Sequence, residues 1–128
     1  MAPNITTSTR LTLAVAGLIG AAGVMAAAGA SHGEGSRNLS AIAAICLSHG
    51  PALLALALTG RGRVLRLAAG LLGLGTLIFA GDLGVREWLG HGLFPGAAPL
   101  GGGGMILGWI AIVVAALGKG QWIAFDSK

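Results

Sequence analysis

The chain has 128 residues, enough for one ordinary domain, and 55% of them are hydrophobic while only 9% are charged. A soluble domain carries roughly 25% charged residues because its surface faces water, so this chain has too little charge to be a soluble globule. The same composition excludes intrinsic disorder, which requires low hydrophobicity and high charge. The class that remains is an integral membrane protein.

The net charge of the chain is small, and its basic residues are spread along the sequence. The formal net charge is +4, and the basic residues lie in short loops and tails without forming a basic helix face. We therefore expect no nucleic-acid partner, and we attribute the basic residues to orientation in a membrane. Cys46 is the single cysteine, so no disulfide can form within the chain.

Four apolar segments follow one another, at about residues 11–30, 39–59, 64–84 and 100–118. About 20 helical residues cross a hydrocarbon layer roughly 30 Å thick, and every segment is about that long. Strands are not expected, because apolar and polar residues do not alternate and Ala and Leu dominate. Short connections make successive helices antiparallel. The predicted fold is therefore an all-α integral membrane bundle of four antiparallel transmembrane helices, forming a single domain over residues 1–128.

The distribution of Lys and Arg predicts the orientation of this bundle. One side holds six basic residues, namely Arg10, Arg61, Arg63, Arg66, Lys119 and Lys128. The other side holds two, Arg37 and Arg86. Because Lys and Arg accumulate on the cytoplasmic side, both termini and the arginine-rich loop are expected in the cytoplasm of a bacterial inner membrane.

The first segment has a competing interpretation. Arg10, the apolar run and the sequence at 28–30 (AGA) resemble a secretory signal with its cleavage site. The run is longer than the usual apolar core of a signal, and its removal would place the arginine-rich loop opposite the C-terminal lysines. We therefore expect this segment to remain as a span.

Small residues offer surfaces on which helices can approach closely. Lipid is as apolar as leucine, so helices in a bilayer associate through close packing, which small residues permit. The candidate packing positions are Gly17, Gly20, Gly73, Gly104 and Gly108. Packing within the bundle is the favoured interpretation, and a docking face for another membrane subunit is the alternative.

His49 is the clearest polar group inside a predicted span. It lies ten residues into the second segment and is followed by Gly50 and Pro51, where the helix is expected to kink. Ionisable groups within a bilayer are costly and often functional, so His49 is a candidate proton or ligand group. The favoured interpretation is a neutral histidine hydrogen-bonded to a neighbouring helix.

Asp82 is the second candidate and lies near the outer end of the third segment. A pair with Arg86, four residues later, is natural on a helix. Asp82 and His49 differ in depth by roughly 10 Å along the helix axes, so the sequence does not establish a direct bond between them. An interfacial ion pair is favoured over a proton relay.

The predicted outer loops hold further polar residues, namely His32, Glu34, Arg37, Arg86 and His91. Their spacing matches no metal-ligand motif, and a haem with two histidine ligands would need two histidines at matched depth. We therefore expect no metal, no other cofactor and no catalytic residue. A membrane enzyme or redox subunit that uses His32, His49 or His91 is the weakest of the functional hypotheses.

Four sequence motifs follow one another in a recognisable order: a glycine- and alanine-rich segment at 17–32, SHGPALL at 48–54, FAGDL at 79–83 and the run 99–109. This order resembles domain-of-unknown-function family 423, whose members are small four-span membrane proteins. The first two motifs look like the family's first- and second-helix motifs, and the other two resemble its later signatures. The resemblance implies a fold and a membrane location, without an established activity.

Two other functional hypotheses rank above the membrane enzyme or redox subunit. The first is a small non-enzymatic membrane protein, a structural or accessory subunit that packs against lipid, a larger membrane complex or further copies of itself. The second is a transporter or conduit for protons or small molecules, centred on His49 and Asp82. The first is favoured because small-residue faces are present and catalytic constellations are not.

Overall fold

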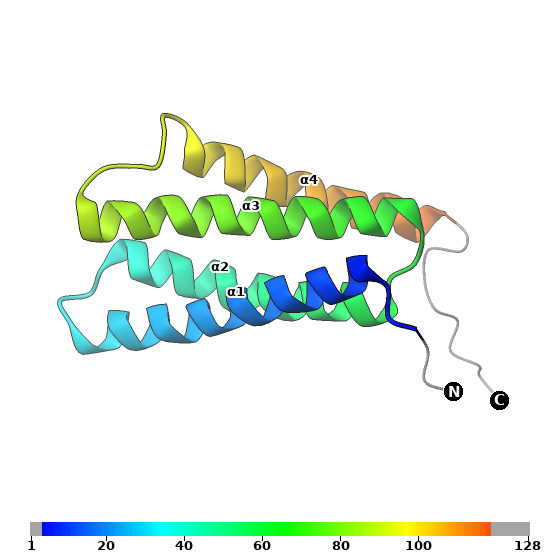
Figure 1. The fold of residues 1–128 in the computed structure, drawn as a ribbon. Helices are drawn as coiled ribbons and strands as arrows, with labels where there is room; N and C mark the ends of the chain where they lie inside the picture. Colours follow the sequence, from blue (N-terminus) through cyan, green and yellow to red (C-terminus); the bar gives the residue numbers. More distant parts are fainter. Residues whose placement is uncertain (1–3, 119–128) are drawn as a thin grey trace.

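The computed structural model describes residues 4–118 and contains four long helices, without a strand in that range (Figure 1). They are α1 (Thr7–His32), α2 (Arg37–Thr59), α3 (Gly62–Leu89) and α4 (Ala97–Leu117). All four are long and apolar enough to cross a membrane. The all-helical prediction is confirmed, and each helix covers nearly all of the apolar segment predicted for it.

The helices form two hairpins, α1 with α2 and α3 with α4. Successive helices run back and forth along one long axis, and α2 packs on α3 to join the hairpins (Figure 1). The start of α1, the α2–α3 connection and the end of α4 lie at one end of the molecule. We call this the arginine end, and the opposite end the loop end. Lys119 and Lys128, which entered the predicted orientation, lie outside the described residues.

Side chains and glycines fix the helix ends. Thr6 and Ser36 cap the N-termini of α1 and α2, and each accepts a hydrogen bond from the backbone N–H three residues later. At the end of α3, Gly90 adopts a left-handed conformation (φ 77°) that suits glycine. Here the prediction was wrong in one respect, because α3 continues through Arg86 to Leu89 instead of ending near residue 84.

The closest helix crossings are made by glycines. A Cβ added to Gly75 would lie 2.7 Å from the carbonyl oxygen of Gly101, so α3 and α4 touch backbone to backbone at this point. A Cβ on Gly50 would lie 3.2 Å from the backbone nitrogen of Gly20, where α2 crosses α1. Close contact of this kind is the expected source of association between helices in lipid.

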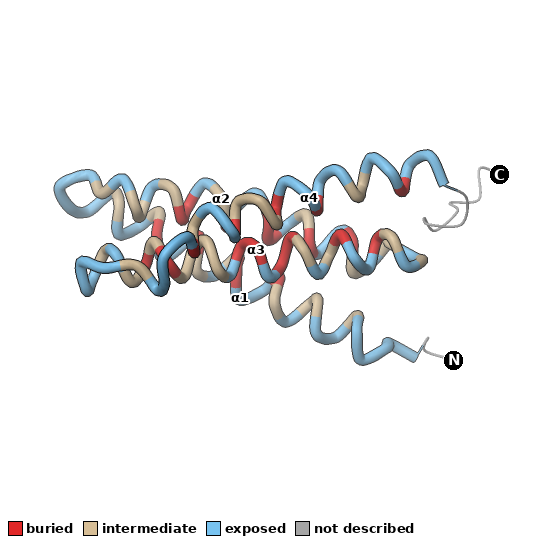
Figure 2. The backbone as a smooth tube through the Cα atoms, turned by 90° about the horizontal axis from the view of Figure 1, so that it is seen from above, coloured by how far each residue is buried: buried red, intermediate tan, exposed pale blue. Residues whose placement is uncertain are grey.

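Buried side chains lie where the helices face one another, and the outward faces remain exposed (Figure 2). The largest fully buried apolar side chains are Ile19, Leu53 and Leu72. The outward face of α4 is apolar and exposed at Leu100, Ile106, Leu107, Ile110, Val113, Val114 and Leu117. In water this surface would be unfavourable, whereas lipid tolerates it.

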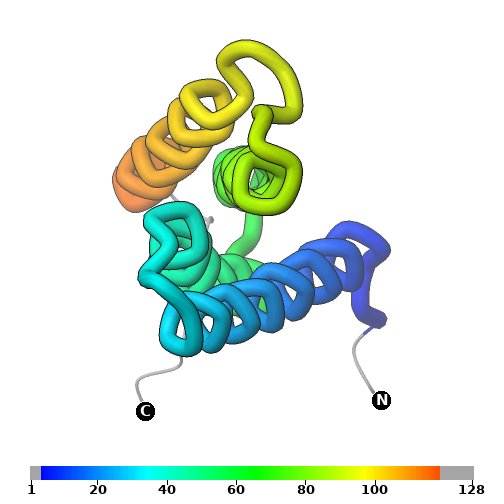
Figure 3. The backbone as a smooth tube through the Cα atoms, turned by 90° about the vertical axis from the view of Figure 1, so that its left-hand side faces the viewer, coloured from blue at the N-terminus to red at the C-terminus, as the bar shows by residue number. Residues whose placement is uncertain are grey.

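The four helices do not all pack against one another as they would in a regular four-helix bundle. Seen along the long axis, α1 runs obliquely beneath α3, and its start lies on the opposite side of the molecule from α4 (Figure 3). Consistently, α1 packs closely on α2 and only slightly on α3. The oblique crossing leaves a crevice between α1 and α3.

Candidate functional site

His49 lies in the middle of α2 and is 6% exposed. The indole nitrogen Nε1 of Trp109, on α4, donates a hydrogen bond to His49 Nε2 at 3.1 Å. The two rings meet edge to face, with 5.7 Å between their centroids. His49 therefore ties the second hairpin to the first at mid-length, as the favoured interpretation of the sequence expected.

This contact determines which tautomer His49 adopts. An indole N–H can only donate, so Nε2 must be the accepting nitrogen and Nδ1 must carry the proton. Nδ1 lies 2.9 Å from the carbonyl oxygen of Ile45, to which it donates, and 3.1 Å from the hydroxyl of Ser48. A neutral His49 thus has a partner at each ring nitrogen, and protonation of Nε2 would break the bond to Trp109.

Replacement of Trp109 by Phe removes this bond and is expected to lower the free energy of unfolding by about 1 kcal/mol, as for other hydrogen bonds between membrane helices. The measurement is unfolding in mixed micelles with increasing dodecyl sulfate. Trp88→Phe is the matched control, because Trp88 is 74% exposed at the end of α3. Equal stability of the two variants would show that the His49–Trp109 bond contributes nothing.

Asp82 is fully buried near the loop end of α3, and both of its carboxylate oxygens have partners. Arg86 Nε donates to Oδ2 at 2.7 Å, and the backbone N–H of Leu93 donates to Oδ1 at 2.7 Å. The predicted pair of Asp82 and Arg86 is therefore present. Gly92 leaves room for it, since a Cβ there would lie 2.7 Å from Arg86 Nη2. Asp82 thus holds the α3–α4 loop against α3.

Glu87 makes a second polar contact at the loop end, which joins the two hairpins. Its Oε2 accepts hydrogen bonds from Ser36 Oγ at 2.6 Å and from Asn38 Nδ2 at 3.1 Å. Because Ser36 also caps α2, the carboxylate lies beside the positive end of that helix dipole.

The structure does not bring the two intramembrane candidates together. His49 bonds to α4 at mid-length, whereas Asp82 bonds to its own helix and to the loop beyond it. Within residues 4–118, no hydrogen bond joins the two side chains. Each side chain therefore makes its contacts in a separate part of the molecule.

The polar residues predicted for the outer loops are distributed over helix ends and loops. His32 is the last residue of α1, Arg37 the first of α2, and Arg86 belongs to α3, so only Glu34 and His91 lie in loops. The part of the chain that the structure describes contains no group of three or more His, Cys, Asp or Glu able to hold a metal.

The five candidate packing glycines differ in how closely a neighbouring helix approaches them. A Cβ on Gly108 would meet Leu72 at 2.8 Å, and on Gly73 or Gly104 it would make ordinary contacts at 3.6 Å. A Cβ added to Gly20 would meet nothing within 4 Å, although the backbone nitrogen of Gly20 lies 3.2 Å from the Cβ position of Gly50. Added to Gly17, a Cβ would meet nothing within 4 Å, so internal packing does not require that glycine.

Several contacts were not predicted from the sequence. The bond from Trp109 to His49 requires knowledge of how α2 and α4 face one another, and so does the bond from Thr76 Oγ1 to the sulfur of Met105. The only available signal was that Trp109 and His49 both lie near mid-span. The contacts of Glu87 were missed because α3 was predicted to end before it.

No curated protein and no solved structure matches this chain. One family model does match, described as a protein of unknown function (DUF423), and it covers residues 19–102. Since this match spans more than half of the chain and agrees with the motifs found above, the chain belongs to the DUF423 family.

Proposed function

We propose that this chain is a small, non-enzymatic, multi-pass protein of the bacterial inner membrane, where it acts as a structural or accessory subunit. The observation that carries the proposal is the outward apolar surface of the helices, most complete along α4. Such a surface is suited to lipid and to the helices of a larger complex or of further copies.

A non-enzymatic role is supported by the contacts that the polar side chains of α2 and α3 make. His49, Asp82 and Glu87 are each engaged in contacts that join helices or fix a loop. A conduit centred on His49 and Asp82 receives less support, because His49 has partners at both ring nitrogens and does not line any of the four cavities described in the molecule.

The proposed orientation places the arginine end in the cytoplasm. Arg10, Arg61, Arg63 and Arg66 all belong to this end, and the loop end carries Arg37 and Arg86. The asymmetry follows the general excess of basic residues on the cytoplasmic side.

The test of the accessory role is the mass of the particle extracted in a mild detergent. Sedimentation equilibrium with the detergent density-matched is expected to give a mass above the 12.5 kDa of one chain, from a partner or from self-association. A homogeneous 12.5 kDa monomer without a partner would contradict this role.

A further inference from the structure

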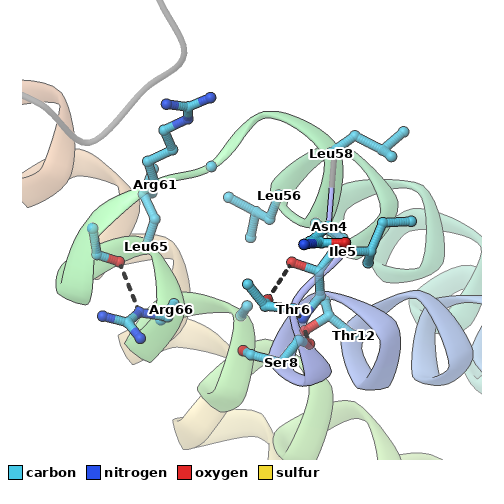
Figure 4. Close-up of a pocket in the computed structure, with 15 residues that line it drawn as sticks. Asn4, Ile5, Thr6, Ser8, Thr12, Leu56, Leu58, Arg61, Leu65 and Arg66 are labelled. Carbon is cyan, nitrogen blue, oxygen red and sulfur yellow. Dashed lines mark hydrogen bonds between the residues drawn. The ribbon is translucent and has the colours of Figure 1, made fainter. Parts of the chain in front are cut away.

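A cavity of about 560 Å³ lies at the arginine end, between the start of α1 and the first turns of α3 (Figure 4). Hydroxyl groups of α1 line one side, and Arg61 and Arg66 line the other. Leucines from the end of α2 and the start of α3 complete the wall, and Leu56 lies between the two polar sides in Figure 4. The cavity therefore combines cationic, hydroxyl and apolar groups.

Within residues 4–118, no acidic side chain lies at the arginine end to neutralise the positive charge of its arginines. The three acidic residues within residues 4–118, Glu34, Asp82 and Glu87, all belong to the loop end. Figure 4 shows the guanidinium groups of Arg61 and Arg66 pointing in different directions, and Arg66 Nε makes only a long contact of 3.4 Å with a backbone carbonyl. Both side chains are exposed and long enough to turn toward an anion at the mouth of the cavity.

A second cavity of about 360 Å³ continues from the first along the crevice between α1 and α3. The two share Ser8, Thr12, Arg66 and Ala69 in their walls. Beyond these shared residues the wall becomes apolar, with Leu11, Val15, Leu53, Leu74 and Leu77. Along this crevice α1 runs obliquely to α3 (Figure 3).

We infer that this crevice binds one anionic glycerophospholipid, with its phosphate at Arg61 and Arg66 and an acyl chain between α1 and α3. The inference rests on the proposed membrane location, because the arginine end would then lie at headgroup level. A cationic mouth followed by an apolar channel matches an amphiphile, and arginine is well suited to phosphate. The hydroxyl of Ser8 lies where the two parts meet and can donate to a glycerol ester oxygen, whereas the hydroxyl of Thr12 already donates to the backbone carbonyl of Ser8.

The headgroup contact is tested with a pair of double variants that carry equal charge. Arg61→Gln with Arg66→Gln removes both arginines of the cavity wall, whereas Arg10→Gln with Arg63→Gln removes two arginines of the same end that do not line it. At about 1 kcal/mol for each arginine near an anionic lipid, the first pair is expected to bind phosphatidylglycerol about 30-fold more weakly than wild type. The control pair should bind severalfold more tightly than the first.

The acyl contact is tested with a matched pair of glycine variants. Gly70 lines the apolar channel and has open space at its Cβ, so Gly70→Leu is expected to fill the channel. Gly17 also has open space but lines neither cavity, and Gly17→Leu is the control. Only Gly70→Leu should weaken phosphatidylglycerol binding.

Binding is measured by native mass spectrometry of the delipidated full chain in detergent, titrated with phosphatidylglycerol, phosphatidylcholine or soluble glycerol phosphate. The inference predicts retention of phosphatidylglycerol and little binding of the other two. Equal binding of phosphatidylcholine, equal binding of glycerol phosphate, or equal loss in the two double variants would each overturn it. Failure of the membrane location itself would be distinct, because the chain would then be released from membranes by alkaline carbonate.

Discussion

Gly75→Ala is expected to lower the free energy of unfolding by about 1–3 kcal/mol, the usual cost of overfilling a well-packed contact. The added methyl group would lie 2.7 Å from the carbonyl oxygen of Gly101 and 2.9 Å from the backbone nitrogen of Met105. Both are backbone atoms, so α3 and α4 must separate to accept it. The measurement is the dodecyl sulfate fraction at which the purified chain unfolds in mixed micelles.

Gly70→Ala is the matched control on the same helix, because a Cβ at Gly70 meets nothing within 4 Å. Alanine favours a helix over glycine by roughly 1 kcal/mol, so this control should be unchanged or slightly more stable than wild type. If Gly75→Ala were as stable as Gly70→Ala, the close crossing of α3 and α4 would be refuted.

Asp82→Ala is expected to release the α3–α4 loop. The substitution removes the acceptor of the Leu93 N–H and the partner of Arg86 at once. Hydrogen bonds to charged groups are among the stronger ones, so cleavage of the loop by an added protease should become roughly ten- to a hundredfold faster. The initial cleavage rate of the folded chain in detergent gives the measurement.

Two variants separate this effect from a general loss of stability. Glu34→Ala removes an exposed acid from the other loop of the same end and should leave cleavage of the α3–α4 loop unchanged. Asp82→Asn keeps an oxygen that can accept from Leu93 and should fall between wild type and Asp82→Ala. Equal cleavage of wild type and Asp82→Ala would mean that Asp82 does not hold the loop.

Hydrophobic length was enough to predict the four helices. Runs of about 20 apolar residues determine the number of helices and their approximate bounds. The pair of Asp82 and Arg86 was also predictable, because both residues lie on one helix four positions apart. Contacts between residues of one helix can therefore be predicted from their spacing in the sequence alone.

Contacts between helices were harder to predict, because glycine is so frequent that spacing alone does not reveal which face meets a neighbour. Gly17 was a candidate packing position, yet its Cβ position is open, whereas the crossing at Gly75 and Gly101 was not identified. Likewise, the partner of His49 depends on the rotation of α4 about its axis, which places Trp109 against α2. Such rotations depend on the packing of all the helices together.

The most direct test of the central claim, that these helices cross the membrane with the arginine end inside, is the labelling of single cysteines by a membrane-impermeant maleimide. With Cys46 replaced by Ala, Gly35→Cys probes the α1–α2 loop and Arg63→Cys probes the arginine end. Right-side-out vesicles should label only at position 35, and inside-out vesicles only at position 63. Labelling of both positions in one kind of sealed vesicle, or the reverse pattern, would contradict the proposed arrangement.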